Sequence, residues 1–170
     1  SREPGGTELG KGLRRILLDN ATGEISPRSE ALLYAADRAH HVYSLIRPAL
    51  ERGDVVITDR YFDSSIAYQG AGRILSPNEV ARINRWATES LFPTLTIILD
   101  QPADIGLSRI KSADRLESES IEFHNRVRQE YLQLANVDPE RYLVIDARKP
   151  IIEIHQEITA RISQLSVKKP

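Results

Sequence analysis

Apolar side chains recur every three or four positions through most of this sequence, the spacing of helices that bury one face. The spacing predicts helices over the segments that run from Leu9 to Leu17, Leu32 to Ile46, Val80 to Leu91, Phe123 to Leu134 and Ile151 to Leu165, with a shorter one from about Ala103. Helices therefore make up most of the expected fold.

Helix starts are marked by side chains that can accept hydrogen bonds from the first free backbone N–H groups. Thr7 precedes the first helix, and Ser26 precedes the second, which has Pro27 at its first position. The stretch "SPNE" combines an N-cap serine, Ser76, with a proline and with a glutamate at the third helical position. Pro48 should kink or interrupt the second helix, because proline has no N–H to donate.

Three short apolar runs, over residues 55–58, 95–99 and 142–145, predict buried strands between the helices. Strands that alternate with long helices favour an α/β fold, a parallel sheet flanked by helices. Nearly continuous apolar runs are typical of strands covered on both faces. Three strands make a narrow sheet for so many helices, and the sequence contains no methionine. We therefore expect a fragment whose upstream part supplies at least one central strand.

Composition and charge narrow the possible partners. The chain has 170 residues, which suits a single domain, with 23 Lys and Arg against 24 Asp and Glu and a formal net charge of −1. This balance gives no basic surplus for binding nucleic acid or a membrane surface. No apolar run approaches the roughly 18–20 residues that span a bilayer. Cysteine is absent, which excludes disulfides and thiolate metal sites and fits a cytoplasmic protein.

Charged residues follow two of the predicted strands. Asp59 and Arg60 come just past residues 55–58, and Asp100 ends the next strand. Ligands of open parallel sheets bind beyond the carboxyl ends of the strands. A carboxylate there can orient a metal ion or its waters, and an arginine offers a planar fork for phosphate. The alternative is a plain ion pair at the end of the sheet.

Arginines recur in the loops on this expected face, at Arg2, Arg60, Arg73, Arg109 and Arg115. The stretch "SREPGGT" adds a glycine turn that opens a helix, where backbone N–H groups favour anions. Several arginines beside a carboxylate suggest phosphate transfer between two bound substrates. No GxxxxGK[ST] phosphate-binding loop occurs within the 170 residues.

Five stretches appear in a specific order: "REPGGT", "LLYAADRAHHV", "DRYFDSSIAYQG", "DRLESESIEFHNRVRQEYL" and "LVIDA". Together they resemble the bacterial thymidylate kinases, a family of P-loop nucleoside monophosphate kinases, over nearly the whole chain. The resemblance implies a P-loop NTPase-like fold in which residues 1–170 form a single kinase domain. It also implies that the family's first strand, P-loop, first helix and second strand lie upstream, and that residues 109–120 form a lid over ATP.

The resemblance implies transfer of the γ-phosphoryl group of ATP to dTMP with Mg²⁺, giving dTDP and ADP for dTTP synthesis. Arg2 and Arg60 would then hold the 5′-phosphate of dTMP, and Asp59 would organise that phosphate and the metal-bound waters. Within the lid, Arg115 is our first choice and Arg109 the second for stabilising the transferred charge next to ATP. The family also implies a homodimer packed through helices, with the second helix as a candidate surface.

The base of dTMP has its own expected contacts. Tyr34 stands where the family usually has a phenylalanine that stacks on thymine, and Arg38, four residues later, can reach a carbonyl edge of the base. Ser65 and Gln69 would complete the reading of the base. Read without the resemblance, Tyr34 and Arg38 are a core tyrosine and a surface arginine, and Ser65 and Gln69 satisfy loop backbone.

Two other functions remain open from the sequence. One is a P-loop kinase for another nucleotide or nucleoside. The other is a non-catalytic dimeric binding module without a P-loop. Because nothing in the 170 residues would cradle the β- and γ-phosphates of ATP, we expect no kinase activity from these residues alone.

Overall fold

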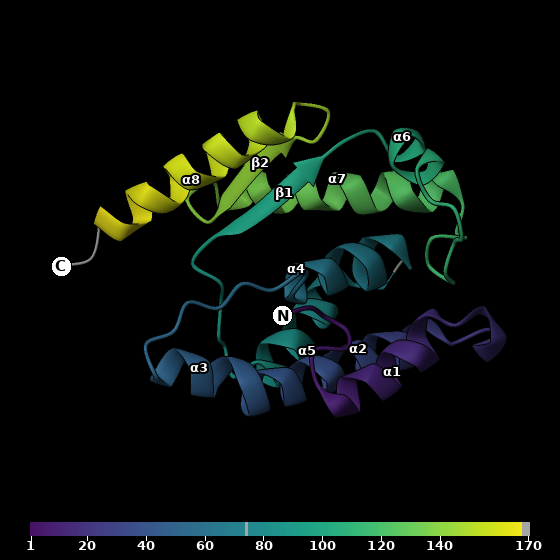
Figure 1. Ribbon diagram of the computed structural model, residues 1–170. Coiled ribbons are helices and arrows are strands. Elements are labelled where there is room, and N and C mark those ends of the chain that lie inside the picture. The colour runs from purple at the N-terminus through teal and green to yellow at the C-terminus, as the bar shows by residue number, and fades with distance from the viewer. Residues whose placement is uncertain (74, 168–170) are drawn as a thin grey trace.

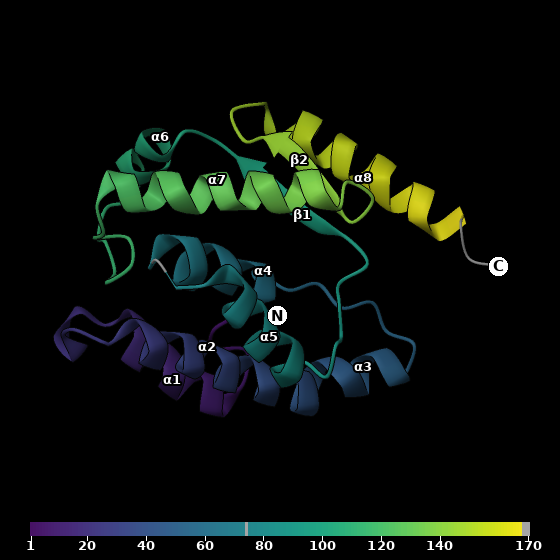
Figure 2. The same ribbon diagram turned by 180° about the vertical axis from the view of Figure 1, so that it is seen from behind.

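The chain is arranged in two layers in the computed structural model, which describes residues 1–73 and 75–167 (Figure 1). One layer contains helices α1 (Glu8–Leu18), α2 (Pro27–His41), α3 (Arg47–Glu51) and α5 (Pro77–Ala87). The other contains strands β1 (Thr96–Asp100) and β2 (Tyr142–Asp146) with helices α6 (Ala103–Ser108), α7 (Ile121–Val137) and α8 (Ile151–Val167). The short helix α4 (Phe62–Ser65) lies between the layers, as the view from behind also shows (Figure 2).

The expected helix starts are confirmed by their capping contacts. The Thr7 hydroxyl accepts a hydrogen bond from the Gly10 N–H at 2.9 Å, which caps α1. Ser26 caps α2 in the same way, with Pro27 at its first position. Ser76 accepts from the Glu79 N–H at 3.4 Å and caps α5. Helix α5 ends at Ala87, earlier than its apolar stripe suggested, because residues after it turn into the left-handed region.

Pro48 interrupts the second helix as expected. The backbone just before it widens into a π turn over Val42–Ile46, in which Arg47 N–H bonds the Val42 carbonyl. A further π turn, Ile66–Gly72, follows α4, and a 3-10 turn covers Asn20–Thr22. Widened turns of this kind re-aim the side chains that follow them.

The sheet holds two parallel strands among the described residues. β1 and β2 pair in register from Thr96 opposite Tyr142 to Asp100 opposite Asp146, which confirms two of the three predicted strands. Both strands thus end in aspartates, Asp100 held by Arg128 at 2.7 Å and Asp146 held by Arg148 at 2.7 Å.

The third predicted strand, over residues 55–58, is wrong. The segment is extended but joins no sheet, and Val55 and Ile57 are 89% and 77% exposed rather than buried. A strand forms only where its backbone hydrogen-bonds along a neighbouring strand. Among the described residues, the only backbone paired with this segment is the short stretch of residues 1–3. Ser1 N–H bonds the Ile57 carbonyl, and one bridge joins Arg2 to Asp59. These contacts are too few to bury the apolar run.

A buried charged contact joins the two layers. Asp63 at the start of α4 accepts hydrogen bonds from both terminal nitrogens of Arg141 at 3.1 Å and from the Tyr142 hydroxyl at 2.6 Å. Arg141 and Tyr142 lie at the beginning of β2, so this cluster fixes α4 against the sheet. The residues that follow α4 therefore have a defined position relative to both layers.

Gly72 lies where the π turn after α4 meets α7, and we expect Gly72→Ala to destabilise the fold by about 1–3 kcal/mol. A Cβ there would lie 2.7 Å from Phe123 Cε2 and 3.1 Å from a Val127 methyl, inside the core. Gly12→Ala is the matched control, because a Cβ on this α1 residue meets nothing within 4 Å and should raise stability by about 0.5–1 kcal/mol. Urea unfolding of both variants measures the difference; a Gly72→Ala change no larger than that of the control would contradict the packing.

None of the described helices is both long enough and apolar enough to cross a membrane.

Candidate active site

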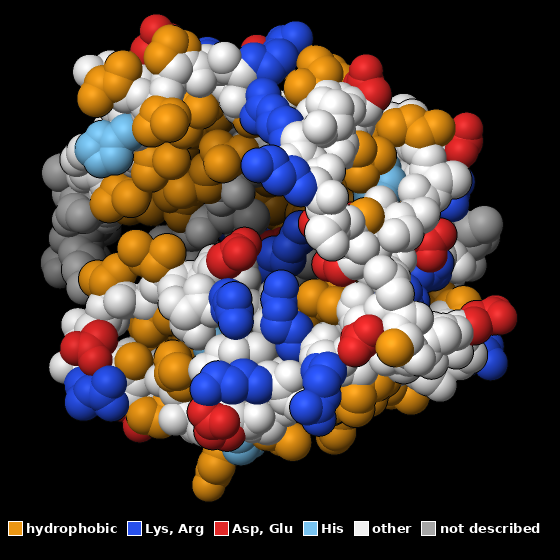
Figure 3. All heavy atoms as spheres, turned by 45° about the vertical axis from the view of Figure 1, so that its right-hand side comes forward, with side chains coloured by type: hydrophobic (Ala, Val, Ile, Leu, Met, Phe, Trp, Pro, Cys, Tyr) orange, Lys and Arg blue, Asp and Glu red, His pale blue; other side chains and the backbone are white. Residues whose placement is uncertain are grey.

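One cavity of about 220 Å³ gathers most of the residues that the sequence singled out. Six of the nine predicted site residues line it: Tyr34, Arg38, Asp59, Arg60, Ser65 and Gln69. They come from α2, from the segment before α4, and from α4 and its π turn. Lys and Arg side chains form a band near the middle of the face in Figure 3, beside a hollow lined by hydrophobic side chains.

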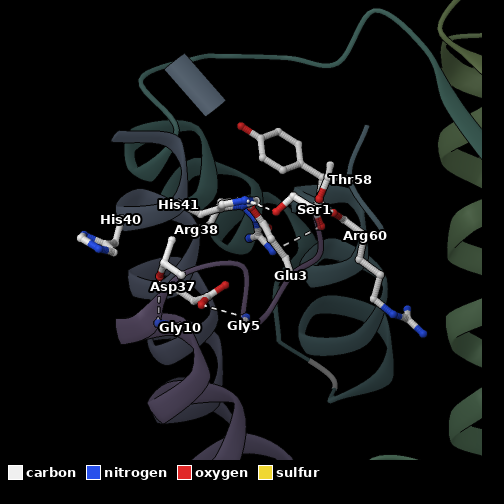
Figure 4. A network of polar contacts seen from close by, with 12 residues as sticks. Ser1, Glu3, Gly5, Gly10, Asp37, Arg38, His40, His41, Thr58 and Arg60 are labelled. Atoms are coloured by element: carbon white, nitrogen blue, oxygen red, sulfur yellow. Dashed lines mark hydrogen bonds and ion pairs between the residues drawn. The ribbon is translucent and has the colours of Figure 1, made fainter. Parts of the chain in front are cut away.

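Asp59 and Arg60 line the cavity side by side. The backbone of Arg60 is left-handed, with φ 66°, although it is not a glycine. Its guanidinium lies 5.1 Å from the centre of the Tyr68 ring, so a cation–π contact holds the charged group over the cavity wall. Figure 4 shows the Arg60 side chain pointing away from the buried cluster around Arg38.

Arg2 lies next to Asp59 through the backbone rather than through its side chain. Its residue pairs with Asp59 in an isolated parallel bridge, and Glu3 N–H bonds the Asp59 carbonyl at 2.8 Å. The side chain of Arg2 is not among those that line the cavity. Its role at a phosphate therefore stays a prediction.

Arg38 is fully buried, so the interpretation of a surface arginine is wrong. Its Nε donates to Glu3 at 2.6 Å, and its terminal nitrogens donate to Ser65 Oγ at 3.1 Å, to Asn84 Oδ1 and to the Tyr61 carbonyl at 3.3 Å. A guanidinium has five N–H groups. These contacts use four, so one N–H of Arg38, a residue that lines the cavity, has no partner within residues 1–73 and 75–167.

Glu3 is the carboxylate at the centre of this buried cluster (Figure 4). It accepts from Arg38, and its other oxygen lies 2.8 Å from His41 Nδ1. Because an ionised carboxylate only accepts, the Nδ1 of His41 carries the hydrogen, and Nε2 can accept from the Ser1 hydroxyl at 2.6 Å. Glu3 also lines the cavity. The sequence did not predict this position, because an acidic residue beside a proline and two glycines reads as part of an exposed turn.

Glu30 forms a second buried cluster behind the cavity. Its side chain accepts from Gln69 Nε2 at 3.1 Å, from Arg73 at 3.2 Å and from Arg115. Burial alone would raise the pKa of this carboxyl, but the hydrogen bonds from Arg73, Arg115 and Gln69 outweigh it and lower the pKa below its ordinary value. Glu30 is therefore ionised at neutral pH, and sequence reasoning missed it.

The lid arginines do not line the cavity. Arg115 donates to the Leu17 carbonyl at 2.7 Å as well as to Glu30, so its guanidinium is held on the α1–α2 side. Arg109 follows α6 directly. Leu116, within the expected lid segment, is buried and lines the cavity. The catalytic roles of Arg115 and Arg109 stay predictions.

The cavity is also lined by residues that the sequence did not identify, among them Arg14, Tyr68, Asp114, Glu117 and His124. Tyr68 packs edge-on against Phe123 and Tyr131, with ring centres 6.0 and 6.5 Å apart. The Nε2 atom of His124 is buried and has no hydrogen-bond partner within the described part of the chain. Tyr68 could have been identified from the sequence because it precedes Gln69. Nothing in the sequence distinguished His124 from the other histidines on helices.

No cluster of three or more His, Asp or Glu side chains that could hold a metal ion occurs within residues 1–73 and 75–167. Mg²⁺ commonly binds through one or two carboxylates together with waters and substrate phosphates. Asp59, an exposed carboxylate at the mouth of the cavity, fits that mode of binding.

Known proteins share both this sequence and this fold. The family model described as "Thymidylate kinase" matches residues 1–158. The chain belongs to the thymidylate kinase family. A thymidylate kinase of Leifsonia xyli subsp. xyli is 56% identical over 166 residues, which is 95% of this chain and 78% of that protein. One from Clavibacter michiganensis subsp. michiganensis is 53% identical over 169 residues, 97% of this chain and 80% of the relative.

The crystal structure of thymidylate kinase from Ehrlichia chaffeensis has the same fold, with a TM-score of 0.76 and 30% sequence identity. The match covers 95% of this chain and 78% of that chain. This likeness confirms the expected α/β fold of P-loop nucleoside monophosphate kinases. Membership of the thymidylate kinase family makes the chain a transferase of nucleotide biosynthesis whose reaction is ATP-dependent phosphorylation of dTMP toward dTTP. Neither the kinase for another nucleotide nor the non-catalytic module is favoured.

Proposed function

We propose that the cavity is the dTMP site, with the 5′-phosphate beside Asp59 and Arg60 and the base between Tyr34, Arg38, Ser65 and Gln69. The observation that carries this proposal is that one cavity is lined both by the charged pair Asp59 and Arg60 and by the aromatic and amide side chains of Tyr34 and Gln69. A nucleoside monophosphate has the same polarity, with a dianion at one end and a flat, hydrogen-bonding ring at the other.

The phosphate end has the chemistry that an acceptor phosphate needs. A guanidinium binds phosphate oxygens through two parallel N–H groups, and the arginine charge persists at any physiological pH. Arg60 is anchored at Tyr68 by its ring contact and a side-chain hydrogen bond, and it makes no ion pair with a carboxylate within residues 1–73 and 75–167, so the guanidinium has N–H groups left for an anion. Asp59 beside it would hold Mg²⁺, which supplies neutralisation of phosphate charge when bound.

The base end discriminates by hydrogen bonding as well as by stacking. Tyr34 is largely buried and presents its ring to the cavity from α2. Ser65 and Gln69 are fully buried side chains that line the cavity, so a base there would meet polar groups withdrawn from water. Leaving such groups unpaired is costly, which is how a site rejects the wrong base.

ATP would approach from the side of the lid, residues 109–120, with Arg115 and Arg109 as the cations nearest the transferred group. In this role Arg115 would leave Glu30 when the lid closes, since both contacts of its guanidinium now face α1 and α2. Phosphoryl transfer depends mainly on positioning and charge stabilisation. Because its substrates are cytoplasmic metabolites, we place the enzyme in the cytoplasm.

A homodimer through α2 and the turn after it is supported by two large exposed side chains on this stretch. Leu32 is 57% exposed and Tyr43 is 76% exposed, and Trp86 on α5 is 81% exposed. Aromatic residues are enriched at such interfaces. Analytical ultracentrifugation is the measurement of this assembly.

The dTMP site is tested by calorimetric titration with dTMP, dCMP, dGMP and AMP, followed by a coupled assay of the complete gene product with ATP and Mg²⁺. We expect dTMP to bind most tightly and to be the preferred acceptor. Preference for another monophosphate would overturn the proposal. So would a crystal soaked with dTMP in which the nucleotide lies away from Asp59 and Arg60.

A further inference from the structure

Glu30 is a fully buried acid in the first turn of α2, behind the part of the cavity assigned to the base. Its partners come from two separate segments: Gln69 and Arg73 in and just past the π turn after α4, and Arg115 within the lid segment, residues 109–120. A buried acid with two arginine partners is ordinarily a structural ion cluster. The contact with Gln69 gives this one a further consequence.

The direction of the Gln69 amide follows from the chemistry of its partner. An amide has a donating nitrogen and an accepting oxygen, whereas an ionised carboxylate only accepts. The nitrogen of Gln69 must therefore face Glu30, as it does at 3.1 Å. The oxygen is left for the cavity that Gln69 lines, and it has no hydrogen-bond partner among residues 1–73 and 75–167.

We propose that Glu30 is a positioning residue that sets base specificity, by holding the Gln69 amide so that its oxygen faces the base as an acceptor. This inference rests on the proposed dTMP site. Thymine presents an N3–H donor next to its O4 acceptor, whereas cytosine presents an N3 acceptor next to an N4 amino donor. The Gln69 oxygen and the one remaining N–H of Arg38 complement thymine and oppose cytosine.

Arg73 keeps this arrangement in place whether the lid is open or closed. It bonds both oxygens of Glu30 and so keeps the carboxylate negatively charged also after Arg115 leaves, and Glu30 then has no proton with which to bind the Gln69 oxygen in a flipped amide. Without that charge, the amide could rotate by half a turn and present its nitrogen to the cavity. The rotated amide would suit cytosine and would repel the N3–H of thymine.

Glu30→Gln tests the proposal, because the neutral amide has the same shape and can either donate or accept. The readout is the ratio of the dissociation constants for dCMP and dTMP, measured by calorimetry. We expect this ratio to fall by about tenfold or more, as dTMP binding weakens and dCMP binding strengthens. Glu30→Asp keeps an acceptor-only group and should retain most of the preference for dTMP.

Glu119→Gln is the matched control. Glu119 bonds the same Arg73 at 2.5 Å but does not touch Gln69, so the ratio should stay unchanged. If Glu30→Gln weakens both nucleotides by one common factor, Glu30 is only structural and the inference is overturned. A wild-type protein without preference for dTMP would instead overturn the proposed function itself.

If the Glu30→Gln variant does not fold, a measurement on the wild-type protein still tests the proposal. Side-chain NH₂ protons of Gln69 held by a buried carboxylate should exchange slowly with solvent and give resolved NMR signals without nucleotide. Rapid exchange of these protons would show that the amide is not held, and would overturn the inference.

Discussion

Replacing Arg60 with alanine should weaken dTMP binding by about 100-fold while leaving thymidine binding nearly unchanged. The guanidinium is the charged fork at the phosphate end of the cavity, and losing a charge-assisted pair costs about 1.5–3 kcal/mol or more. Thymidine has no phosphate, so it should not sense the loss. Calorimetric titration with both ligands separates a phosphate contact from general damage to the cavity.

Arg52→Ala is the matched control for Arg60→Ala. Arg52 follows α3, pairs with exposed Asp54 at 2.9 Å and does not line the cavity. It removes the same charge from the chain and should leave dTMP binding unchanged. Equal losses for dTMP and thymidine in Arg60→Ala would show that Arg60 shapes the cavity rather than binds phosphate.

Replacing Glu3 with alanine should lower the free energy of unfolding by about 3–5 kcal/mol, the usual cost of breaking a buried ion pair from one side. Glu3 and Arg38 are both almost fully buried, and His41 depends on the same carboxylate. The variant would leave the charge of Arg38 without its nearest counter-ion. Urea denaturation followed by circular dichroism measures the loss.

Glu8→Ala supplies the comparison for Glu3→Ala. Glu8 pairs with Lys11 in the first turn of α1, where both side chains are mostly exposed. Exposed pairs of this kind contribute little, so we expect a change of roughly 0.5 kcal/mol or less. Similar losses in the two variants would mean that burial of the Glu3 cluster does not matter for stability.

The helices could be predicted from the sequence because their signals are local. Thr7, Ser26 and Ser76 lie next to the N–H groups they cap, and Pro48 acts on the helix that contains it. Strands β1 and β2 were equally readable, because each is a short apolar run that finds a parallel neighbour.

Residues 55–58 have the same apolar composition, yet they form no strand. A strand needs a partner, and partner identity is not a property of the run itself. Here the neighbouring backbone is residues 1–3, which provides a single bridge. The sequence shows that this segment has a high propensity for strand, but it does not show whether a neighbouring strand is there to pair with it.

The candidate site was likewise predicted in part and missed in part. The resemblance of ordered stretches indicated Asp59, Arg60, Tyr34, Ser65 and Gln69, and the cavity brings these residues together. The acids that organise them were missed, because their partners are remote in sequence. Glu3 meets Arg38 at a separation of 35 residues, and Glu30 meets Arg115 at 85. An acid in a turn or in a first helical turn is normally exposed, so neither gave a signal.

The left-handed backbone at Arg60 has a consequence for directed evolution. Holding a residue with a side chain in this region costs about 1–2 kcal/mol, a penalty that glycine escapes. A library of variants selected for thermostability alone would therefore become enriched in glycine at position 60 and would lose the guanidinium. Such libraries should be screened for nucleotide binding at every round, since the most thermostable variants would include some that no longer bind the substrate.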